Sequence, residues 1–132
     1  MKKSVILCVD DEKIILDSIK TQLKEKYGTL FLYETAESAT EALEIIEEIM
    51  MESDTTLVII SDWLMPVIKG DEFLLRVHKK YPRSLKIMLT GQADQDSIER
   101  SKKDANLYKC IRKPWSTSEL TSTIDSGLAL TY

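Results

Sequence analysis

The chain alternates short apolar runs with segments in which apolar residues recur at helical spacing, and this alternation occurs five times. The apolar runs predict strands at residues 4–9, 29–34, 56–60, 85–89 and 107–111. Helical spacing predicts helices over about residues 14–26, 39–51, 71–81 and 96–103, with a fifth helix after residue 116. We therefore expect an α/β fold in which helices cover both faces of a parallel sheet.

Five strand–helix units are too few for an eight-stranded barrel. The expected architecture is a flavodoxin-like, doubly wound (βα)5 sandwich whose parallel five-stranded sheet has the order 2-1-3-4-5. Two capping-box patterns support the helix starts, because Ser38 is followed by Glu41 and Ser116 is followed by Glu119. Folds of this type place their functional residues at the carboxyl ends of the strands.

The length and charge of the chain limit its class. With 132 residues it suits one domain over residues 1–132 and can bury a substantial core. A formal net charge of -4 argues against direct binding of nucleic acid by this domain. The sequence has neither an apolar stretch long enough for a membrane span nor a secretory leader, so we expect no membrane partner and a cytoplasmic location. Cys8 and Cys110 lie in apolar runs, which favours two reduced thiols over a disulfide.

Polar residues follow four of the five predicted strands at the point where each strand ends. Asp10 and Asp11 follow the first strand and Asp62 follows the third. Thr90 ends the fourth strand, and Lys113 follows the fifth. The first, third and fourth strands are neighbours in the predicted order, so these side chains should meet at one edge of the sheet. A carboxylate beside a core is costly unless it has a function, and we interpret Asp62 as a nucleophile.

Three carboxylates at one edge would repel one another unless a cation lay among them. Oxygen ligands without histidine or thiolate suit a hard cation, so Asp10, Asp11 and Asp62 predict a site for Mg²⁺, with Mn²⁺ as the alternative. Lys113 adds a positive charge and Thr90 a hydroxyl donor, and the set matches phosphoryl transfer to an aspartate. Each of these residues alone is weaker evidence of function, because an Asp-Asp doublet is more often a helix cap and a lone carboxylate can cap a turn.

Four motifs in this order resemble the receiver domain of two-component response regulators, over essentially the whole chain. They are Val-Asp-Asp-Glu at 9–12, Asp-Trp-Leu-Met-Pro-Val-Ile-Lys-Gly at 62–70, Met-Leu-Thr-Gly at 88–91 and Lys-Pro-Trp at 113–115. The resemblance implies that a sensor histidine kinase or a phosphotransfer protein donates a phosphoryl group to Asp62, with Mg²⁺, to switch an output surface. It also implies a chain that promotes its own phosphorylation and autodephosphorylation without being a conventional enzyme.

The same resemblance assigns roles around the phospho-acceptor, Asp62. It implies that Asp11 binds Mg²⁺ directly and that Asp10 binds it largely through water. The backbone carbonyl of Leu64 would be a further ligand beside Asp62 itself. Lys113 would contact a phosphoryl oxygen.

The resemblance also implies that Thr90 is the switch hydroxyl and that a cis peptide bond joins Lys113 to Pro114. The sequence departs from the family at Cys110, where an aromatic residue usually swings inward on activation. Tyr108, two residues earlier, would share the strand face of Cys110 by the period of two but lies further from the site. The output surface implied is the fourth helix, the fifth strand and the fifth helix, through which a homodimer could also form.

Two alternatives remain from the residues. An aspartate-nucleophile phosphatase of the haloacid-dehalogenase type needs a second Asp two residues after the nucleophile, and Leu64 occupies that position. A pseudo-receiver that binds a partner without phosphorylation would be favoured if Asp10, Asp11, Asp62 or Lys113 were missing, and all four are present.

Overall fold

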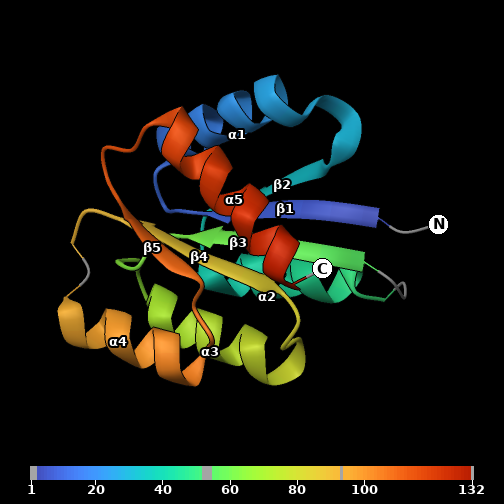
Figure 1. The fold of residues 1–132 in the computed structure, drawn as a ribbon. Helices are drawn as coiled ribbons and strands as arrows, with labels where there is room; N and C mark the ends of the chain where they lie inside the picture. The colour runs from blue at the N-terminus through green and yellow to red at the C-terminus, as the bar shows by residue number, and fades with distance from the viewer. Residues whose placement is uncertain (1–2, 52–54, 93, 132) are drawn as a thin grey trace.

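The computed structural model describes residues 3–51, 55–92 and 94–131 as one five-stranded parallel sheet with helices on both faces (Figure 1). The strands are β1 (Lys3–Val9), β2 (Leu32–Ala36), β3 (Thr55–Ser61), β4 (Leu85–Thr90) and β5 (Lys109–Arg112). The helices are α1 (Lys13–Tyr27), α2 (Ala39–Ile49), α3 (Gly70–Lys80), α4 (Gln95–Asp104) and α5 (Thr117–Thr131). The strand order is β2-β1-β3-β4-β5, and every pairing is parallel, so the predicted fold is confirmed.

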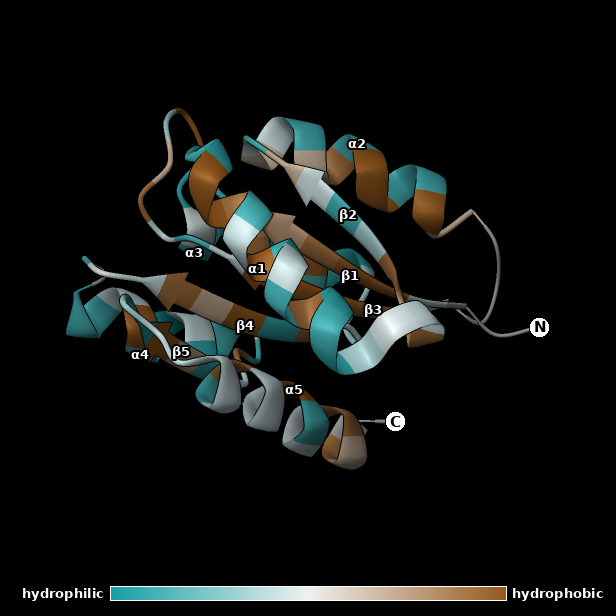
Figure 2. Ribbon diagram, turned by 90° about the horizontal axis from the view of Figure 1, so that it is seen from above, coloured by the Kyte–Doolittle hydropathy of each residue, from teal (hydrophilic) through white to brown (hydrophobic). Residues whose placement is uncertain are grey.

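The sheet separates two apolar clusters. Helices α1 and α5 cover one face, and α2, α3 and α4 cover the other (Figure 1). Successive residues of a strand point to opposite faces, so Leu57 and Ile59 of β3 enter one cluster while Val58 and Ile60 enter the other. Burial on both faces explains why β1 and β3 are largely brown in the hydropathy colouring, whereas the edge strand β2 is mixed (Figure 2).

The predicted second strand began too early. Residues Gly28–Leu30 form a 3₁₀ helix, and β2 starts only at Leu32. Gly28 has a φ of 55°, which ends α1 in a conformation that glycine adopts without steric cost. The hydroxyl of Tyr33 donates to the Gly28 carbonyl oxygen at 2.8 Å, which fixes this tight turn against β2. The predicted fifth strand also began two residues early. Pairing of β5 with β4 starts only at Lys109, after Tyr108.

Both predicted capping boxes begin their helices. The Ser38 hydroxyl accepts a hydrogen bond from the Glu41 backbone N–H at 3.1 Å, and the Ser116 hydroxyl accepts one from Glu119 at 3.0 Å. These bonds satisfy backbone donors that lack partners in the first turn of a helix. Cys8 is buried and Cys110 half-buried, and both thiols are free. None of the helices in the described ranges is long and apolar enough to cross a membrane.

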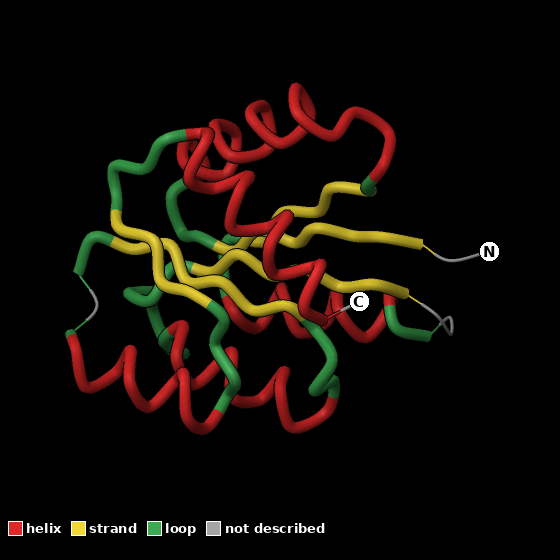
Figure 3. The backbone as a smooth tube through the Cα atoms, viewed as in Figure 1, coloured by secondary structure: helices red, strands yellow, loops and turns green. Residues whose placement is uncertain are grey.

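The carboxyl ends of the central strands meet at one edge of the sheet, where the loops after β1, β3, β4 and β5 gather (Figure 3). Val9 pairs with Ser61, and Ser61 pairs with Met88. The register continues past the strands, because the backbone N–H of Asp62 donates to the Val9 carbonyl at 2.9 Å. The strand ladder therefore fixes the residues that follow each strand at neighbouring positions.

Candidate functional site

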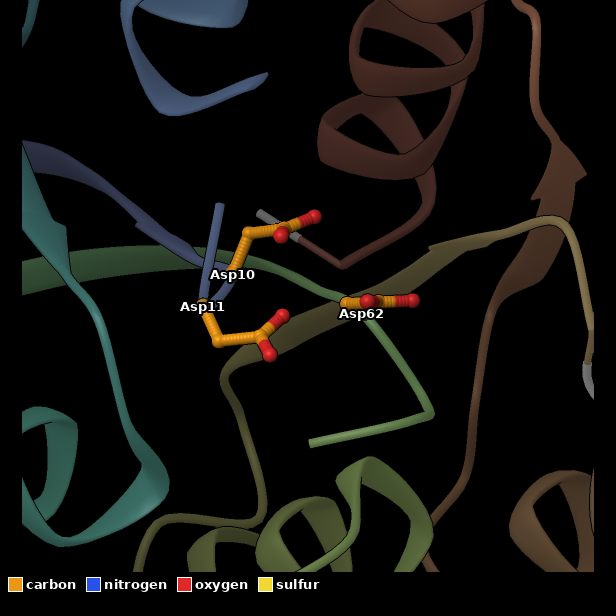
Figure 4. A group of neighbouring side chains, drawn as sticks. All are labelled: Asp10, Asp11 and Asp62. Carbon is orange, nitrogen blue, oxygen red and sulfur yellow. The ribbon is translucent and has the colours of Figure 1, made fainter. Parts of the chain in front are cut away.

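Asp10 and Asp11 at the end of β1 lie beside Asp62 at the end of β3, and their carboxyl groups point to the same side (Figure 4). One oxygen from each residue can be chosen so that the three atoms lie within 4.8 Å of one another. Asp10 and Asp62 are buried, with exposed fractions of 2% and 6%, whereas Asp11 is exposed. The Asp10 Oδ1 atom accepts a hydrogen bond from the Glu12 backbone N–H at 2.9 Å, which orients its carboxylate toward the cluster.

The loop after β3 holds Asp62 through backbone contacts. The Asp62 Oδ1 atom accepts a hydrogen bond from the Trp63 backbone N–H at 2.8 Å. The Trp63 carbonyl accepts one from the Gly70 N–H at 2.7 Å, which brings the start of α3 against the exit of β3. A Cβ atom at Gly70 would collide with the Asp62 carbonyl oxygen and lie 2.8 Å from the Trp63 Cα. Glycine is therefore required for α3 to approach the candidate nucleophile this closely.

The tip of this loop contains a strained residue, Val67. Its φ is 70°, its exposed fraction is 98%, and it is the central residue of a turn in which the Ile68 N–H donates to the Pro66 carbonyl at 2.9 Å. A positive φ is costly for a β-branched side chain. Because Val67 buries almost nothing, no packing energy is lost when it is replaced.

We expect Val67→Asn to raise the free energy of unfolding by about 1 kcal/mol, since asparagine tolerates the left-handed region better than valine. Chemical denaturation of the two proteins measures the difference. Val67→Ala is the matched control, because alanine removes the same exposed apolar surface but keeps a Cβ with a similar steric penalty. Equal stabilisation by alanine and asparagine would show that backbone strain at Val67 is not the cause.

Lys113, which follows β5, brings its ammonium group into the carboxylate cluster. Its Nζ atom lies 2.8 Å from Asp10 Oδ2 and 3.6 Å from Asp62 Oδ2. Burial lowers the pKa of Lys113, but the hydrogen bond to Asp10 and the charges of Asp62 and Asp10 outweigh burial and raise that pKa overall. Lys113 is thus charged and acts as an internal cation for two of the three carboxylates. The Lys113–Pro114 peptide bond is cis.

Thr90, the last residue of β4, is 2% exposed and hydrogen-bonds to Asp62 through its side chain. Its Oγ1 atom also accepts a hydrogen bond from the Gln92 backbone N–H at 3.3 Å. The Thr90 carbonyl accepts one from the Lys113 N–H at 3.1 Å, so the ends of β4 and β5 are joined directly beside the carboxylates. The hydroxyl therefore links the candidate nucleophile to the loop that leads into α4.

The pKa of Asp62 is raised above its ordinary value, mainly because of burial, with a contribution from the charge of Asp10. Hydrogen bonds from Thr90 and Trp63 and the charge of Lys113 oppose this rise without cancelling it. Burial therefore outweighs the positive charge and the hydrogen bonds that the protein itself brings to Asp62. A site composed of three carboxylates and short of positive charge suits a hard divalent cation, so the donor set fits Mg²⁺ or Mn²⁺.

An open cleft of about 490 Å³ gives access to these groups. Asp11, Asp62, Thr90 and Lys113 line it, together with Leu64, whose side chain is 43% exposed. Leu64 therefore places an apolar side chain in the same cleft as Asp62.

Cys110 and Tyr108 do not share a strand face, so this expectation was wrong. Cys110 pairs with Met88 and packs with the cluster under α3 and α4. Tyr108 packs with the cluster under α1 and α5, and its hydroxyl lies 2.7 Å from the Ser126 hydroxyl of α5. The Tyr108 ring also lies against Gly127, where a Cβ atom would come within 3.1 Å of it. These contacts hold Tyr108 on α5, away from the face where the usual aromatic residue would move.

A buried cation, which the sequence patterns above did not predict, lies on the same strand as Thr90. Lys86 of β4 is 0% exposed, and its Nζ atom donates to the Ser84 carbonyl at 2.7 Å and to the Ser84 hydroxyl at 3.1 Å. The signal was a charged residue within an otherwise apolar central strand. A strand buried on both faces has no solvent side on which to place such a residue.

Comparison with known proteins identifies the family. A family model described as the response regulator receiver domain matches residues 6–125. The regulatory protein VanR of Enterococcus faecium is 34% identical over 124 residues, which cover 93% of this chain and 49% of VanR. The hydrogenase transcriptional regulatory protein HoxA of Cupriavidus necator is 31% identical over 123 residues, or 93% of this chain, and the matched region is only 24% of HoxA. The chain thus spans about a quarter of the length of HoxA.

Solved structures agree with this result. A response regulator receiver domain protein from Clostridium thermocellum has a TM-score of 0.81 and 33% identity, with 96% of this chain and 94% of that chain covered. The signal receiver domain of an HD domain-containing protein from Pseudomonas fluorescens has a TM-score of 0.85 and 26% identity, with 99% and 90% covered. Because the family model covers most of the chain and the fold agrees, the protein belongs to the receiver domains of two-component response regulators.

Proposed function

We propose that Asp62 accepts a phosphoryl group from a phosphohistidine on a sensor histidine kinase or a phosphotransfer protein, and that the acyl phosphate then switches an output surface. The observation that carries this proposal is the cluster of three carboxylates, two of which line one open cleft together with Lys113 and Thr90. The membership of the family supports it, since receiver domains are phospho-acceptors as a class.

In the proposed step an Asp62 carboxylate oxygen attacks phosphorus in line with the bond to the donor imidazole. The Oδ1 atom is held by the Trp63 N–H, which leaves Oδ2, 3.6 Å from Lys113 Nζ, as the attacking atom. A phosphorus–oxygen bond forms, the phosphorus–nitrogen bond breaks, and its electron pair returns to the imidazole. Lys113 neutralises charge on the phosphoryl oxygens as they approach.

Asp10, Asp11 and Asp62, with the Leu64 carbonyl as a further ligand, would hold a divalent cation, which would supply additional charge neutralisation at this point. Lys113 lies nearer to Asp10 than to Asp62 before the reaction. Lys113 would therefore exchange Asp10 for a phosphoryl oxygen as the phosphoryl group arrives at Asp62. After transfer, the Thr90 hydroxyl donates to a phosphoryl oxygen and draws the loop before α4 toward the site.

The surface made by α4, β5 and α5 is proposed as the output, and a homodimer through this surface is one form that output can take. Cys110 replaces the usual aromatic residue and α5 holds Tyr108, so coupling through an aromatic side chain on β5 is not proposed. The displacement of α4 by the Thr90 loop is the more direct route. Helix α4 is mostly polar and buries only Ser97, Ile98 and Ser101, which fits an element of low local stability.

Incubation of the chain with a small phosphodonor tests the function. We expect acid-labile phosphate, detected by intact mass, to accumulate with Mg²⁺ and to be absent when a chelator removes the metal. Metal binding can be followed separately by the fluorescence of a Trp115→Phe variant, which keeps Trp63, whose backbone contacts Asp62, as its one tryptophan. A folded chain that binds Mg²⁺ but takes up no phosphate would instead favour a partner-binding module that works without phosphorylation.

Leu64 should control the lifetime of the acyl phosphate. Its apolar side chain lines the cleft beside Asp62 and cannot hydrogen-bond to an attacking water. We expect Leu64→Asn to accelerate dephosphorylation on the order of tenfold, since an amide at this position can orient that water. The decay of purified phosphoprotein gives the rate. Leu64→Met keeps the apolar bulk, so its acyl phosphate should decay at the rate of the parent protein. If Leu64→Met lost its phosphate as fast as Leu64→Asn, this role of Leu64 would be contradicted.

A further inference from the structure

Strand β5 has an open edge. It pairs with β4 alone, so half of its backbone N–H and C=O groups point away from the sheet. Helices α4 and α5 lie on either side of it without covering that edge (Figure 1). An exposed strand edge is a template for pairing with an extended segment of another chain.

A groove of about 280 Å³ runs along this edge between β5 and α4. On the helix side it is lined by Gln95, Ile98 and Lys102, which recur at the spacing of one helix face. On the strand side it is lined by residues 108–110 and by Arg112. The floor is Cys110, whose small side chain replaces the bulk that an aromatic residue would place there.

The groove is cationic although the chain as a whole is acidic. Lys102, Lys109 and Arg112 line it and are all exposed, and none of the described lining residues is acidic. Within residues 3–51, 55–92 and 94–131, these three cations form no salt bridge. Burial raises the pKa of the Cys110 thiol, and the charges of Arg112 and Lys102 oppose this rise. The positive charge of the groove is therefore felt at Cys110. The chain carries a net charge of -4, which makes three unpaired cations at one edge a local exception.

We propose that this groove binds an extended acidic peptide segment of a partner protein, which adds to β5 as a further strand. The peptide backbone pairs with the open edge of β5, and carboxylates on the α4 side of the peptide meet Lys102 and Arg112, which lies on the same strand face as Cys110. A nucleic acid would satisfy the cations but has no strand of amide groups to pair with β5. Docking of the peptide requires no phosphate on Asp62. Only the regulation of this docking rests on the proposed function.

Phosphorylation can regulate this docking because the groove ends next to the site. Arg112 precedes Lys113 directly, and the Lys113 N–H is bonded to the Thr90 carbonyl. The other wall of the groove is α4, which follows the Thr90 loop. Movement of that loop changes the separation of α4 and β5, and therefore the width of the groove.

The probe is a fluorescent peptide of alternating glutamate and valine, measured by anisotropy with the full chain. We expect saturable binding that weakens as salt is raised. We expect Lys102→Gln with Arg112→Gln to weaken binding about tenfold, at roughly 0.7 kcal/mol for each ion pair lost. The matched control, Lys24→Gln with Lys79→Gln, removes two exposed cations elsewhere and should bind like the parent chain.

Two further measurements test the mode of binding. The same peptide N-methylated at alternate residues keeps its charge but cannot form the strand ladder, so it should not bind. Bound peptide should also slow the reaction of Cys110 with a thiol reagent, with buried Cys8 as the unreactive internal reference. Equal binding of the N-methylated peptide, unchanged Cys110 reactivity, or displacement of the peptide by short duplex DNA would each overturn the proposal.

Labelling of the Lys102 and Arg112 double variant with a small phosphodonor separates this proposal from the proposed function. Neither residue belongs to the carboxylate site, so Asp62 should be labelled as in the parent chain. Normal labelling of a parent chain that fails to bind the peptide would overturn the docking alone. Peptide binding by a chain that cannot be labelled would overturn phosphorylation alone.

Discussion

Replacement of Asp62 by asparagine is expected to abolish phosphate incorporation from a small phosphodonor in the presence of Mg²⁺. Asparagine has no carboxylate oxygen that can form an acyl phosphate. Among the acidic residues of the described site, Asp62 alone lies near both Lys113, at 3.6 Å, and the Thr90 side chain. The loss should be complete within detection, because the nucleophile itself is removed. Intact mass and acid lability of the product measure it.

The fold should survive this substitution. The asparagine side-chain oxygen can still accept the hydrogen bond that the Trp63 N–H donates to Asp62 Oδ1. The raised pKa of Asp62 means that its surroundings disfavour the ionised form, so removal of the charge should leave the free energy of unfolding unchanged or slightly higher at neutral pH without metal. A folded Asp62→Asn protein that lacks phosphate would thus have lost chemistry and not structure.

Asp71→Asn is the matched control. Asp71 lies in the first turn of α3, outside the carboxylate cluster, and carries the same functional group. It should be labelled at the parent rate. Retention of label in Asp62→Asn would place the acceptor elsewhere, and loss of label in both variants would indicate a general effect of acidic residues on donor binding.

The fold and most of the site follow from local patterns. The alternation of apolar runs with helical spacing sets the order of elements, and the right-handed crossover sets how they wind. The residue after each strand is then placed by the register, so Asp10, Asp62, Thr90 and Lys113 could be predicted to meet from their positions in the sequence alone. Their convergence is the consequence of parallel strands that end at one edge.

Features that depend on side-chain packing could not be predicted in this way. The period of two would have put Tyr108 with Cys110, but the ladder begins only at Lys109, and α5 holds Tyr108 through Ser126 and Gly127. The pairing of Lys113 with Asp10 at 2.8 Å depends on the side-chain conformations at this edge of the sheet, which no sequence pattern specifies. Tertiary contacts therefore decide which way the Tyr108 side chain points and which carboxylate Lys113 contacts, and local spacing does not distinguish these possibilities.

Replacement of the buried Lys86 by methionine is expected to stabilise the protein at neutral pH by about 2 kcal/mol. Burial lowers the pKa of Lys86 from its ordinary value of 10.5 to about 8, and at 1.36 kcal/mol for each pKa unit this costs about 3 kcal/mol when the lysine is charged. The lost hydrogen bonds to Ser84 offset about 1 kcal/mol of the gain. Chemical denaturation measures the difference, and the exposed Lys79→Met on α3 is the control, with an expected change within about 0.5 kcal/mol.

The gain from Lys86→Met should shrink as the pH is raised from about 8 toward 10.5. In that interval the unfolded chain keeps its proton on Lys86 while the folded chain loses it, so the parent protein gains stability relative to the variant. Burial also raises the pKa of the Cys8 thiol, to about 12, which lowers stability at high pH in both proteins alike and cancels in the comparison.

The single histidine gives a second readout. Burial and the charge of Lys86 both lower the pKa of His78, so the pKa of His78 should rise in Lys86→Met. A stability difference that stays constant from neutral to alkaline pH, with His78 unchanged, would mean that the charge of Lys86 does not act inside the fold.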